Sequence, residues 1–372
     1  MSRAHSVLIA AVVCIACAPS CARAADAGKP EYLFHDSHFH LTNYVQQGTD
    51  IHEYLRIMGD KVGRSTLFGI PLQQTWSHEN SGDFAPTYYL QSDAPLYYYS
   101  FTDAYIAMAY RSLPIEQQRR LDPMITGFNP ADMYAVDHIR RVLQVFPGVF
   151  SGIGEFSIHK EFVSAKVAGD TASLADPALD HILEFAAEAG LVVIFHCDID
   201  TPFAKPDQEP VYVRQAVALF ARHPNTTIIW AHTGLGRVVR PAQSQASGFA
   251  RSVNPTHLQI LSYLLDHPAL RHLYFDISWD EVAKYAVSSP EIEQATAKLL
   301  ERHPDRFLFG TDNVAPNDQE TQLRIFHLWD RIFAQLSPSA SVAIRMGNYE
   351  RLFDRARERV RAWERAQSKR AH

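Results

Sequence analysis

Short apolar runs alternate with amphipathic segments along most of this chain. Eight runs have the length and composition of buried strands, and they occupy residues 32–40, 65–73, 122–128, 149–155, 191–196, 226–232, 272–277 and 306–312. Apolar residues recur at helical spacing in other segments, at 51–58, 131–145, 176–189, 211–222, 255–266, 289–303 and 317–335. Strands that alternate with helices predict an α/β fold with a parallel sheet, and eight such units predict a TIM (β/α)8 barrel.

Residues that can bind a metal stand where several of these apolar runs end. His38 and His40 are two residues apart on the first strand, so both imidazoles project from one face toward one metal ion. Four later runs also end on a possible ligand, at Glu155, His196, His232 and Asp312. In a TIM barrel, functional residues gather at the rim where the parallel strands emerge. The pattern therefore predicts a metal centre built from all six residues.

Further polar or aromatic residues lie at or just beyond the predicted strand ends. They are candidates for recognising a substrate carboxylate or ring, and they are His159, Lys160, Arg237, Asp276, Trp279 and Asn313. Asp276 has a second interpretation, because its carboxylate is also placed to contact a metal-binding histidine. Asp36 is expected to support the site rather than to bind the metal.

The first residues have the pattern of an export signal. A polar start with Arg3 and His5 precedes the apolar stretch 7–18, and the small residues of 22–24 fit a cleavage site. We therefore expect residues 1–24 to be a signal peptide and the mature enzyme to be periplasmic. The apolar stretch is too short to span a membrane, so no transmembrane span is expected in the mature chain.

Three of the four cysteines lie in or beside this first segment. Only Cys197 is left in the mature chain, so no disulfide is expected within one chain. Cleavage at Cys21, as in a bacterial lipoprotein, is the less favoured alternative, because Pro19 is atypical at its place in the lipoprotein pattern.

The charge of the chain is mildly acidic. Its 35 basic and 41 acidic residues give a formal net charge of −6, and loss of Arg3 and Arg23 with the signal peptide leaves 33 basic residues and a charge of −8. This balance, without basic runs, argues against nucleic acid or anionic lipid as a partner. A small molecule is the expected partner, and a homo-oligomer is left open.

Residues 25–372 show no linker or tandem repeat, and we expect them to form a single domain. The Tyr-rich region around 77–120 is too long for an ordinary connection in a βα unit, which predicts an insertion in the barrel. Two roles are open for this insertion. It is either a lid over the active site or a segment that packs against the barrel or a second subunit.

Taken in order, these motifs resemble those of the amidohydrolase superfamily. The resemblance rests on Asp36-x-His38-x-His40, Gly152-Ile153-Gly154-Glu155, His196, Trp230-Ala231-His232-Thr233-Gly234 and Gly310-Thr311-Asp312. Residues 347–353 are similar to the C-terminal signature of its amidohydrolase-related branch, which contains hydrolases, lactonases and non-oxidative decarboxylases. The match spans nearly the whole mature chain in the family's order.

The resemblance implies a metal-dependent enzyme with one or two divalent ions. Histidine nitrogens and carboxylate oxygens suit Zn²⁺ first, with Mn²⁺ as an alternative. His38, His40 and His196 are expected to hold the metal. His232 either binds a second metal or polarises the substrate. Glu155 either bridges two metals, binds one, or hydrogen-bonds a metal-binding histidine.

The reaction implied by the resemblance is hydrolysis of an amide, lactone or ester by a metal-activated water. Asp312 is expected to be the general base and then the general acid, and His232 to stabilise the developing oxyanion. Two alternatives stay open. One is non-oxidative decarboxylation at the same site, and the other is a non-catalytic exported binding protein that kept the barrel. The substrate itself does not follow from the fold.

Overall fold

The computed structural model describes residues 32–42, 48–70, 75–76, 90–91, 101–160, 166–167, 170–200, 210–236 and 256–370. All of them belong to the unit Tyr32–His372. The expected signal peptide at 1–24 lies outside these residues, so export stays a prediction, and so does the less favoured lipidation of Cys21. Within the described ranges, no helix has both the length and the apolar character needed to cross a membrane.

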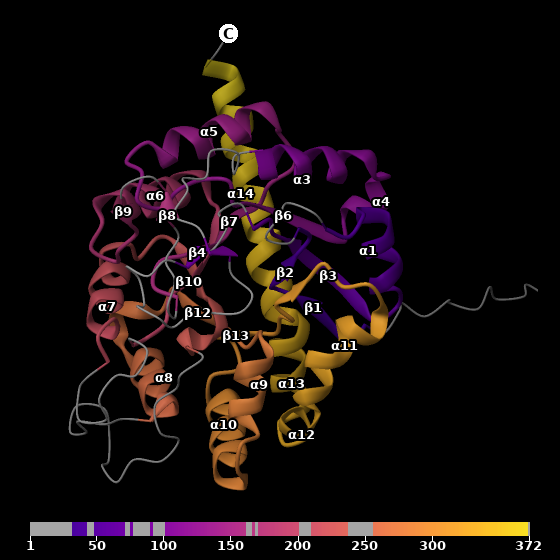
Figure 1. Cartoon of the computed structure of the whole chain (residues 1–372), viewed down its shortest axis with the longest axis vertical. Coiled ribbons are helices and arrows are strands. Elements are labelled where there is room, and N and C mark those ends of the chain that lie inside the picture. Colours follow the sequence, from indigo (N-terminus) through magenta and orange to yellow (C-terminus); the bar gives the residue numbers. More distant parts are fainter. Residues whose placement is uncertain are drawn as a thin grey trace, which may run out of the picture. The chain divides into compact units, whose positions relative to one another are not determined.

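Eight parallel strands form one sheet in the order β1-β3-β6-β7-β10-β11-β12-β13 (Figure 1). Their bounds are Phe34–Asp36, Val62–Leu67, Leu121–Ile125, Gly152–Ser157, Val192–His196, Thr227–Trp230, Leu273–Asp276 and Phe307–Leu308. The first and last strands meet, because the backbone N–H of Ser37 donates to the carbonyl of Phe309 at 3.0 Å. Just beyond them, β2 (Phe39–His40) pairs in parallel with β14 (Asn313–Val314). The sheet closes on itself, and the predicted TIM barrel is confirmed.

Helices follow most of these strands. Their bounds are α1 Ile51–Met58, α3 Phe101–Ser112, α4 Ile115–Gln118, α5 Ala135–Val145, α6 Pro177–Ala189, α7 Val213–Arg222, α8 His257–Asp266, α9 Asp280–Ala286, α10 Pro290–Arg302, α11 Gln319–Leu328, α12 Asp330–Phe333, α13 Pro338–Val342 and α14 Asn348–Arg370. Asp176 and Ser289 accept hydrogen bonds at the starts of α6 and α10, each with Pro at the first helical position. The expected helix 317–335 is divided at Trp329 into α11 and α12. The sequence pattern does not predict α3, α4, α9, α13 or α14.

Shorter elements lie in the connections. They are the strands β4 Thr75–Trp76, β5 Leu90–Gln91, β8 Lys166–Val167 and β9 Asp170–Thr171, the 3₁₀ turns Ala231–Gly234 and Pro268–Leu270, and the π turn Ala343–Gly347. The described part of the expected insertion around 77–120 forms β5, α3 and α4, between β3 and β6. Residues 77–89 and 92–100 of that insertion lie outside the described ranges, so its role as a lid stays a prediction.

Apolar side chains fill both the barrel interior and the space between the barrel and its helices. The larger cluster packs the outer faces of the strands against the surrounding helices. A smaller cluster fills the interior with strand residues that include Met124, Val192, Ile194, Ile229 and Leu308. Residues of α14 complete it, namely Tyr349, Leu352, Phe353 and Ala356. The beginning of α14 therefore closes the end of the barrel at which the strands start (Figure 1).

A buried carboxylate at the start of β6, Asp122, fastens α14 to the barrel. It accepts hydrogen bonds from Tyr349 Oη at 2.8 Å and Arg357 Nε at 2.6 Å, both on α14, and from Arg64 Nη2 on β3 at 2.9 Å. Burial alone would raise the pKa of Asp122. The guanidinium groups of Arg64 and Arg357 outweigh burial and lower this pKa, so the carboxylate stays ionised.

Replacement of this carboxylate should weaken the whole barrel. Asp122→Ala leaves Arg64 and Arg357 without their shared buried partner, so we expect the free energy of unfolding to fall by about 3–5 kcal/mol. Urea unfolding followed by tryptophan fluorescence measures the change. Asp137→Ala, which breaks an exposed pair with Arg140, is the control and should leave stability nearly unchanged. Equal stability of the two variants would contradict this role of Asp122.

Candidate metal centre

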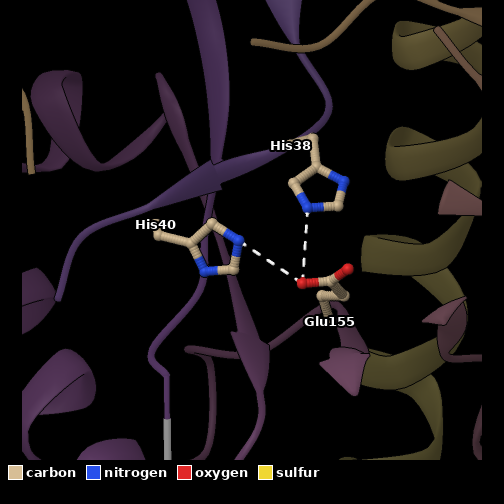
Figure 2. Close-up of side chains that lie close together, drawn as sticks. All are labelled: His38, His40 and Glu155. Carbon is tan, nitrogen blue, oxygen red and sulfur yellow. Dashed lines mark ion pairs between the residues drawn. The ribbon is translucent and has the colours of Figure 1, made fainter. Parts of the chain in front are cut away.

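His38 and His40 point toward the same carboxylate oxygen (Figure 2). Their Nε2 atoms lie 3.6 Å and 3.4 Å from Glu155 Oε2. His40 belongs to β2 and His38 directly precedes it, whereas Glu155 lies on β7. The spacing of two residues brings both imidazoles to one side of the chain. All three side chains are buried, so the polar atoms must find their partners within the site.

The other oxygen of Glu155 faces a second pair of histidines. His196, the last residue of β10, places its Nδ1 atom 2.9 Å from Glu155 Oε1. His232 lies in the turn that follows β11 and places its Nε2 atom 3.4 Å from the same oxygen. One carboxylate therefore lies between two pairs of histidines, and these five residues come from four different segments of the barrel.

Asp312 brings a second carboxylate to this group. Its Oδ1 atom lies 3.4 Å from His38 Nε2 and 3.3 Å from His40 Nε2, and its Oδ2 atom lies 4.0 Å from His232 Nε2. Its backbone N–H donates to the carbonyl of His38 at 2.8 Å. Asp312 and His232 both have left-handed backbone, with φ of 57° and 55°. Such a conformation costs a non-glycine residue on the order of 1 kcal/mol and is concentrated at functional sites.

Hydrogen bonds fix the tautomer of two of the histidines. When neutral, His38 carries its proton on Nδ1, because that atom lies 3.0 Å from the carboxylate of Asp276, which only accepts. The hydroxyl of Ser278 also donates to Asp276, so its oxygen accepts from His232 Nδ1 at 2.8 Å. Each of these histidines therefore turns the unprotonated Nε2 atom toward the centre.

The other two histidines are oriented in the same manner. His40 Nδ1 donates to the carbonyl of Gly69 at 3.4 Å, which leaves its Nε2 atom toward Glu155. His196 lies between two carboxylates, with Nδ1 near Glu155 and Nε2 3.1 Å from Asp198 Oδ1. A proton on Nε2, donated to Asp198, leaves Nδ1 with a lone pair that faces the centre.

These donors fit a divalent cation. His38 Nε2 is buried and has no hydrogen-bond partner among the described residues, which is costly unless another group occupies the space beside it. Within the described residues, donor atoms lie within 4.8 Å of one another in three overlapping groups: His38–His40–Glu155, His38–His232–Asp312 and Glu155–His196–His232. Imidazole nitrogens and carboxylate oxygens are the ligand set preferred by Zn²⁺, and one that Mn²⁺ accepts.

The charges of the site also favour metal binding. Burial would raise the pKa of Glu155, but the charges of His38 and Lys160 hold it well below its usual range. At Asp312 too, the neighbouring histidines lower the pKa against the effect of burial. Burial lowers the pKa of His232, whereas the nearby carboxylates raise the pKa values of His38, His40 and His196 against burial. The carboxylates therefore have the ionised form that binds a metal, and a bound cation would take the place of the protons on these three histidines.

Asp36 supports the site without facing it. Its buried carboxylate accepts from the backbone N–H of Thr311 at 2.9 Å, from Thr311 Oγ1 at 2.7 Å and from Gln322 Nε2 at 2.8 Å. It also accepts from the backbone N–H of His38 at 3.1 Å. Burial raises the pKa of Asp36 to about 6, against the hydrogen bonds from Thr311. Asp36 thus connects the first strand to the last, in the supporting position expected from the sequence.

Asp276 and Asn313, which were expected to bind substrate, are held by hydrogen bonds within the protein. Asp276 contacts His38, which is the second interpretation given to it above, and it accepts from the backbone N–H of His232 at 2.9 Å. Asn313 donates to the backbone carbonyl and the side-chain oxygen of Gln322 at 3.2 Å and 3.1 Å. Both side chains are buried, and the structure gives them positioning contacts rather than contacts to an open site.

The other four candidates are placed differently. The ring of Trp279 lies 5.3 Å from that of His232, at the edge of the centre. Lys160 is partly buried, and its charge acts on the carboxylate at the middle of the site. His159 stacks on a neighbouring tyrosine ring at 3.9 Å, and burial lowers its pKa to about 4. Arg237 lies outside the described residues.

Sequence reasoning did not identify Asp198 and Ser278 as site residues. Each orients a histidine of the centre through the nitrogen that faces away from it. A signal for both is present in the chain, because each follows a strand-end residue by two positions, after His196 and Asp276 respectively. Polar residues at this spacing return to the same side of an extended chain.

The barrel, with histidines and carboxylates gathered at one rim, defines a metal-dependent enzyme of the TIM-barrel class. Residues 36–355 match the sequence model of the Amidohydrolase family, and the chain belongs to that family. Enzymes of this family are metal-dependent, in agreement with the donor set described above. No curated protein sequence matches the chain.

Solved structures similar to this chain share its fold at low sequence identity. A dihydroorotase from Campylobacter jejuni has a TM-score of 0.50 and 13% identity, over 86% of this chain and 83% of that chain. An uncharacterised TIM-barrel protein from Bordetella bronchiseptica has a TM-score of 0.51 and 14% identity, over 87% and 99%. A 2,6-dihydroxybenzoate decarboxylase from Rhizobium has a TM-score of 0.49 and 14% identity, over 87% and 99%.

Loss of the carboxylate that orients His196 should weaken metal binding. Asp198→Ala removes the acceptor for His196 Nε2, so we expect divalent-metal affinity to fall by about 10–100-fold. Competition with a chromophoric chelator measures the affinity. Asp180→Ala is the control, because Asp180 pairs with Arg222 and His223 at the outside of the barrel, and it should bind metal as the wild type does. Unchanged affinity in Asp198→Ala would remove the proposed orienting role.

Proposed function

We propose that this protein is a metal-dependent hydrolase that cleaves an amide, lactone or ester bond. The position of Asp312 carries the proposal. Its side chain is 18% exposed, whereas the side chains of the other five residues at the centre are at most 5% exposed. An ionised carboxylate that lies beside the histidines and is still partly exposed is placed to exchange protons with a substrate. Membership of the amidohydrolase family supports this reaction class.

In the proposed mechanism the chain binds Zn²⁺ as the first choice of cation through His38, His40, His196, His232 and Glu155. When bound, the cation supplies Lewis acidity, which brings the pKa of a coordinated water toward ~7. Asp312 accepts the proton of the attacking water and later returns it to the leaving group. His232 acts as a ligand in this proposal rather than as a donor to the oxyanion, because its proton is on Nδ1 and points to Ser278.

We further propose that the centre holds two cations, with Glu155 between them. Its Oε2 atom faces His38 and His40, whereas its Oε1 atom faces His196 and His232. A carboxylate whose two oxygens face two different histidine pairs is suited to bridge two ions.

Metal content tests the proposed bridge. Elemental analysis of purified, metal-loaded protein should give two equivalents per chain, and Glu155→Ala should give one or fewer, because the bridging carboxylate is lost. Glu184→Ala, an exposed change on α6, should keep both. If the wild type contains one equivalent of metal and Glu155→Ala contains the same amount, both the bridge and direct coordination by Glu155 are refuted.

Asp312→Asn tests the acid–base role. The amide cannot accept the proton, so we expect kcat on a lactone or amide substrate to fall by about 10²–10⁴-fold. The metal content should stay at the wild-type value, since the histidines and Glu155 are intact. Asp330→Asn, an exposed change beside His327, is the matched control. Full turnover in Asp312→Asn would show that another group moves the proton.

A substrate panel separates this reaction from its alternatives. Ring opening of lactones, or cleavage of amides or esters, would support the hydrolase. Release of CO₂ from hydroxylated aromatic acids would assign the site to decarboxylation. Tight binding of ligands without turnover of any compound would favour an exported binding protein.

A further inference from the structure

A cavity lies at the opposite end of the barrel from the metal centre. It has a volume of about 850 Å³ and is bounded by the end of α6, the starts of β11 and β12, and α14. Thr227 and Tyr274 line it from the strands, and Arg355 and Arg359 line it from α14. The cavity is therefore formed where α14 covers the entrance to the barrel interior.

The cavity is basic although the chain as a whole is acidic. Arg271, Arg355 and Arg359 line it, and Glu188 is the acidic residue among the lining side chains. The carboxylate of Glu188 already accepts a hydrogen bond from Trp363 Nε1 at 3.1 Å. Arg355 and Arg359 lie four residues apart on α14, so they occupy one face of the helix. Three guanidinium groups and one carboxylate leave an excess of positive charge in a chain whose net charge is −6.

Two of these arginines have side chains without a partner within the described ranges. The guanidinium groups of Arg271 and Arg355 make no ion pair or hydrogen bond with a described residue, and both side chains are exposed at the cavity. Arg359, by contrast, is held in place. Its Nη2 atom donates to the carbonyl of Ala187 at 2.9 Å, and its Cβ packs where a side chain on Gly190 would otherwise stand. One guanidinium is thus fixed, and two others are free to close on a ligand.

We propose that this cavity binds a small anion of phosphate-type chemistry, either inorganic phosphate or the phosphoryl group of a small molecule. Guanidinium groups present paired N–H donors that match the oxygens of a phosphoryl group. The hydroxyl of Thr227 and the phenol of Tyr274, which accepts from Arg351 at 3.4 Å, add polar lining at the inner wall. A concave site with convergent donors favours such an anion over a broad macromolecular surface.

The site is separate from the metal centre. The apolar cluster of Val192, Ile194, Ile229 and Leu308 fills the barrel interior between the two. The proposal therefore neither requires nor assumes the hydrolytic reaction, and either one can fail without the other.

Calorimetric titration of the metal-loaded full chain with inorganic phosphate, at ionic strength kept constant with chloride, tests the proposal. The metal centre also attracts phosphate, so the comparison between variants identifies the site. Two or three charge-assisted hydrogen bonds predict a dissociation constant of about 1 mM or tighter. Arg271→Gln combined with Arg355→Gln keeps the side-chain stems and should weaken this binding by about tenfold. Arg365→Gln, an exposed change on α14 outside the cavity, should leave it unchanged.

The outcomes are distinct. The site is supported if one binding event is lost in the double variant but kept in the wild type and in Arg365→Gln. Circular dichroism checks that the double variant is folded. The single change Arg271→Gln, which lies outside α14, gives the same test if the double variant does not fold. Equal binding in wild type and variants would overturn the proposal, because the anion would then bind elsewhere or at the metal centre alone. A phosphorylated sugar titrated in the same way separates a phosphoryl compound from free phosphate as the preferred ligand.

Discussion

Closure of the barrel between its first and last strands is the constraint on which the site depends. Asp36 joins the two by accepting hydrogen bonds from Thr311 and Gln322, and the backbone N–H of Asp312 donates to the carbonyl of His38. These contacts connect residues more than 270 positions apart in the chain. Hydrogen bonds between paired strands fix their register. The same closure that completes the sheet therefore brings Asp312 beside His38 and His40.

Within that frame, the histidines are organised by carboxylates on two sides. Glu155 faces the nitrogens that point inward, whereas Asp276 and Asp198 accept from nitrogens that point outward. A buried imidazole with an acceptor on its outer nitrogen keeps one tautomer and one ring orientation. The geometry of the centre therefore depends on Asp276 and Asp198, which bind the outward nitrogens, as well as on the residues that would contact the cation.

The sequence predicts the barrel and the convergence of the six candidate ligands, because each of these residues follows an apolar run and strand ends meet at one rim. It does not predict the tautomers, since these depend on distances between strands far apart in the chain, as between His232 and Ser278. It also missed α14, whose mean hydropathy is low because its outward residues are mostly charged. Its buried residues Tyr349, Leu352, Phe353 and Ala356 recur at the helical spacing that would have indicated it. The export signal lies outside the described residues and stays a prediction.

The position of α14 has a consequence for how the chain acquires its structure. Among the described residues, Tyr349, Leu352 and Phe353 cover the interior of the barrel at the end where the strands start. During synthesis these residues emerge after all eight strands, and a domain generally folds as a unit. The growing polypeptide must therefore carry an exposed apolar core through most of its translation, a stage at which a chaperone that holds unfolded chains would bind it.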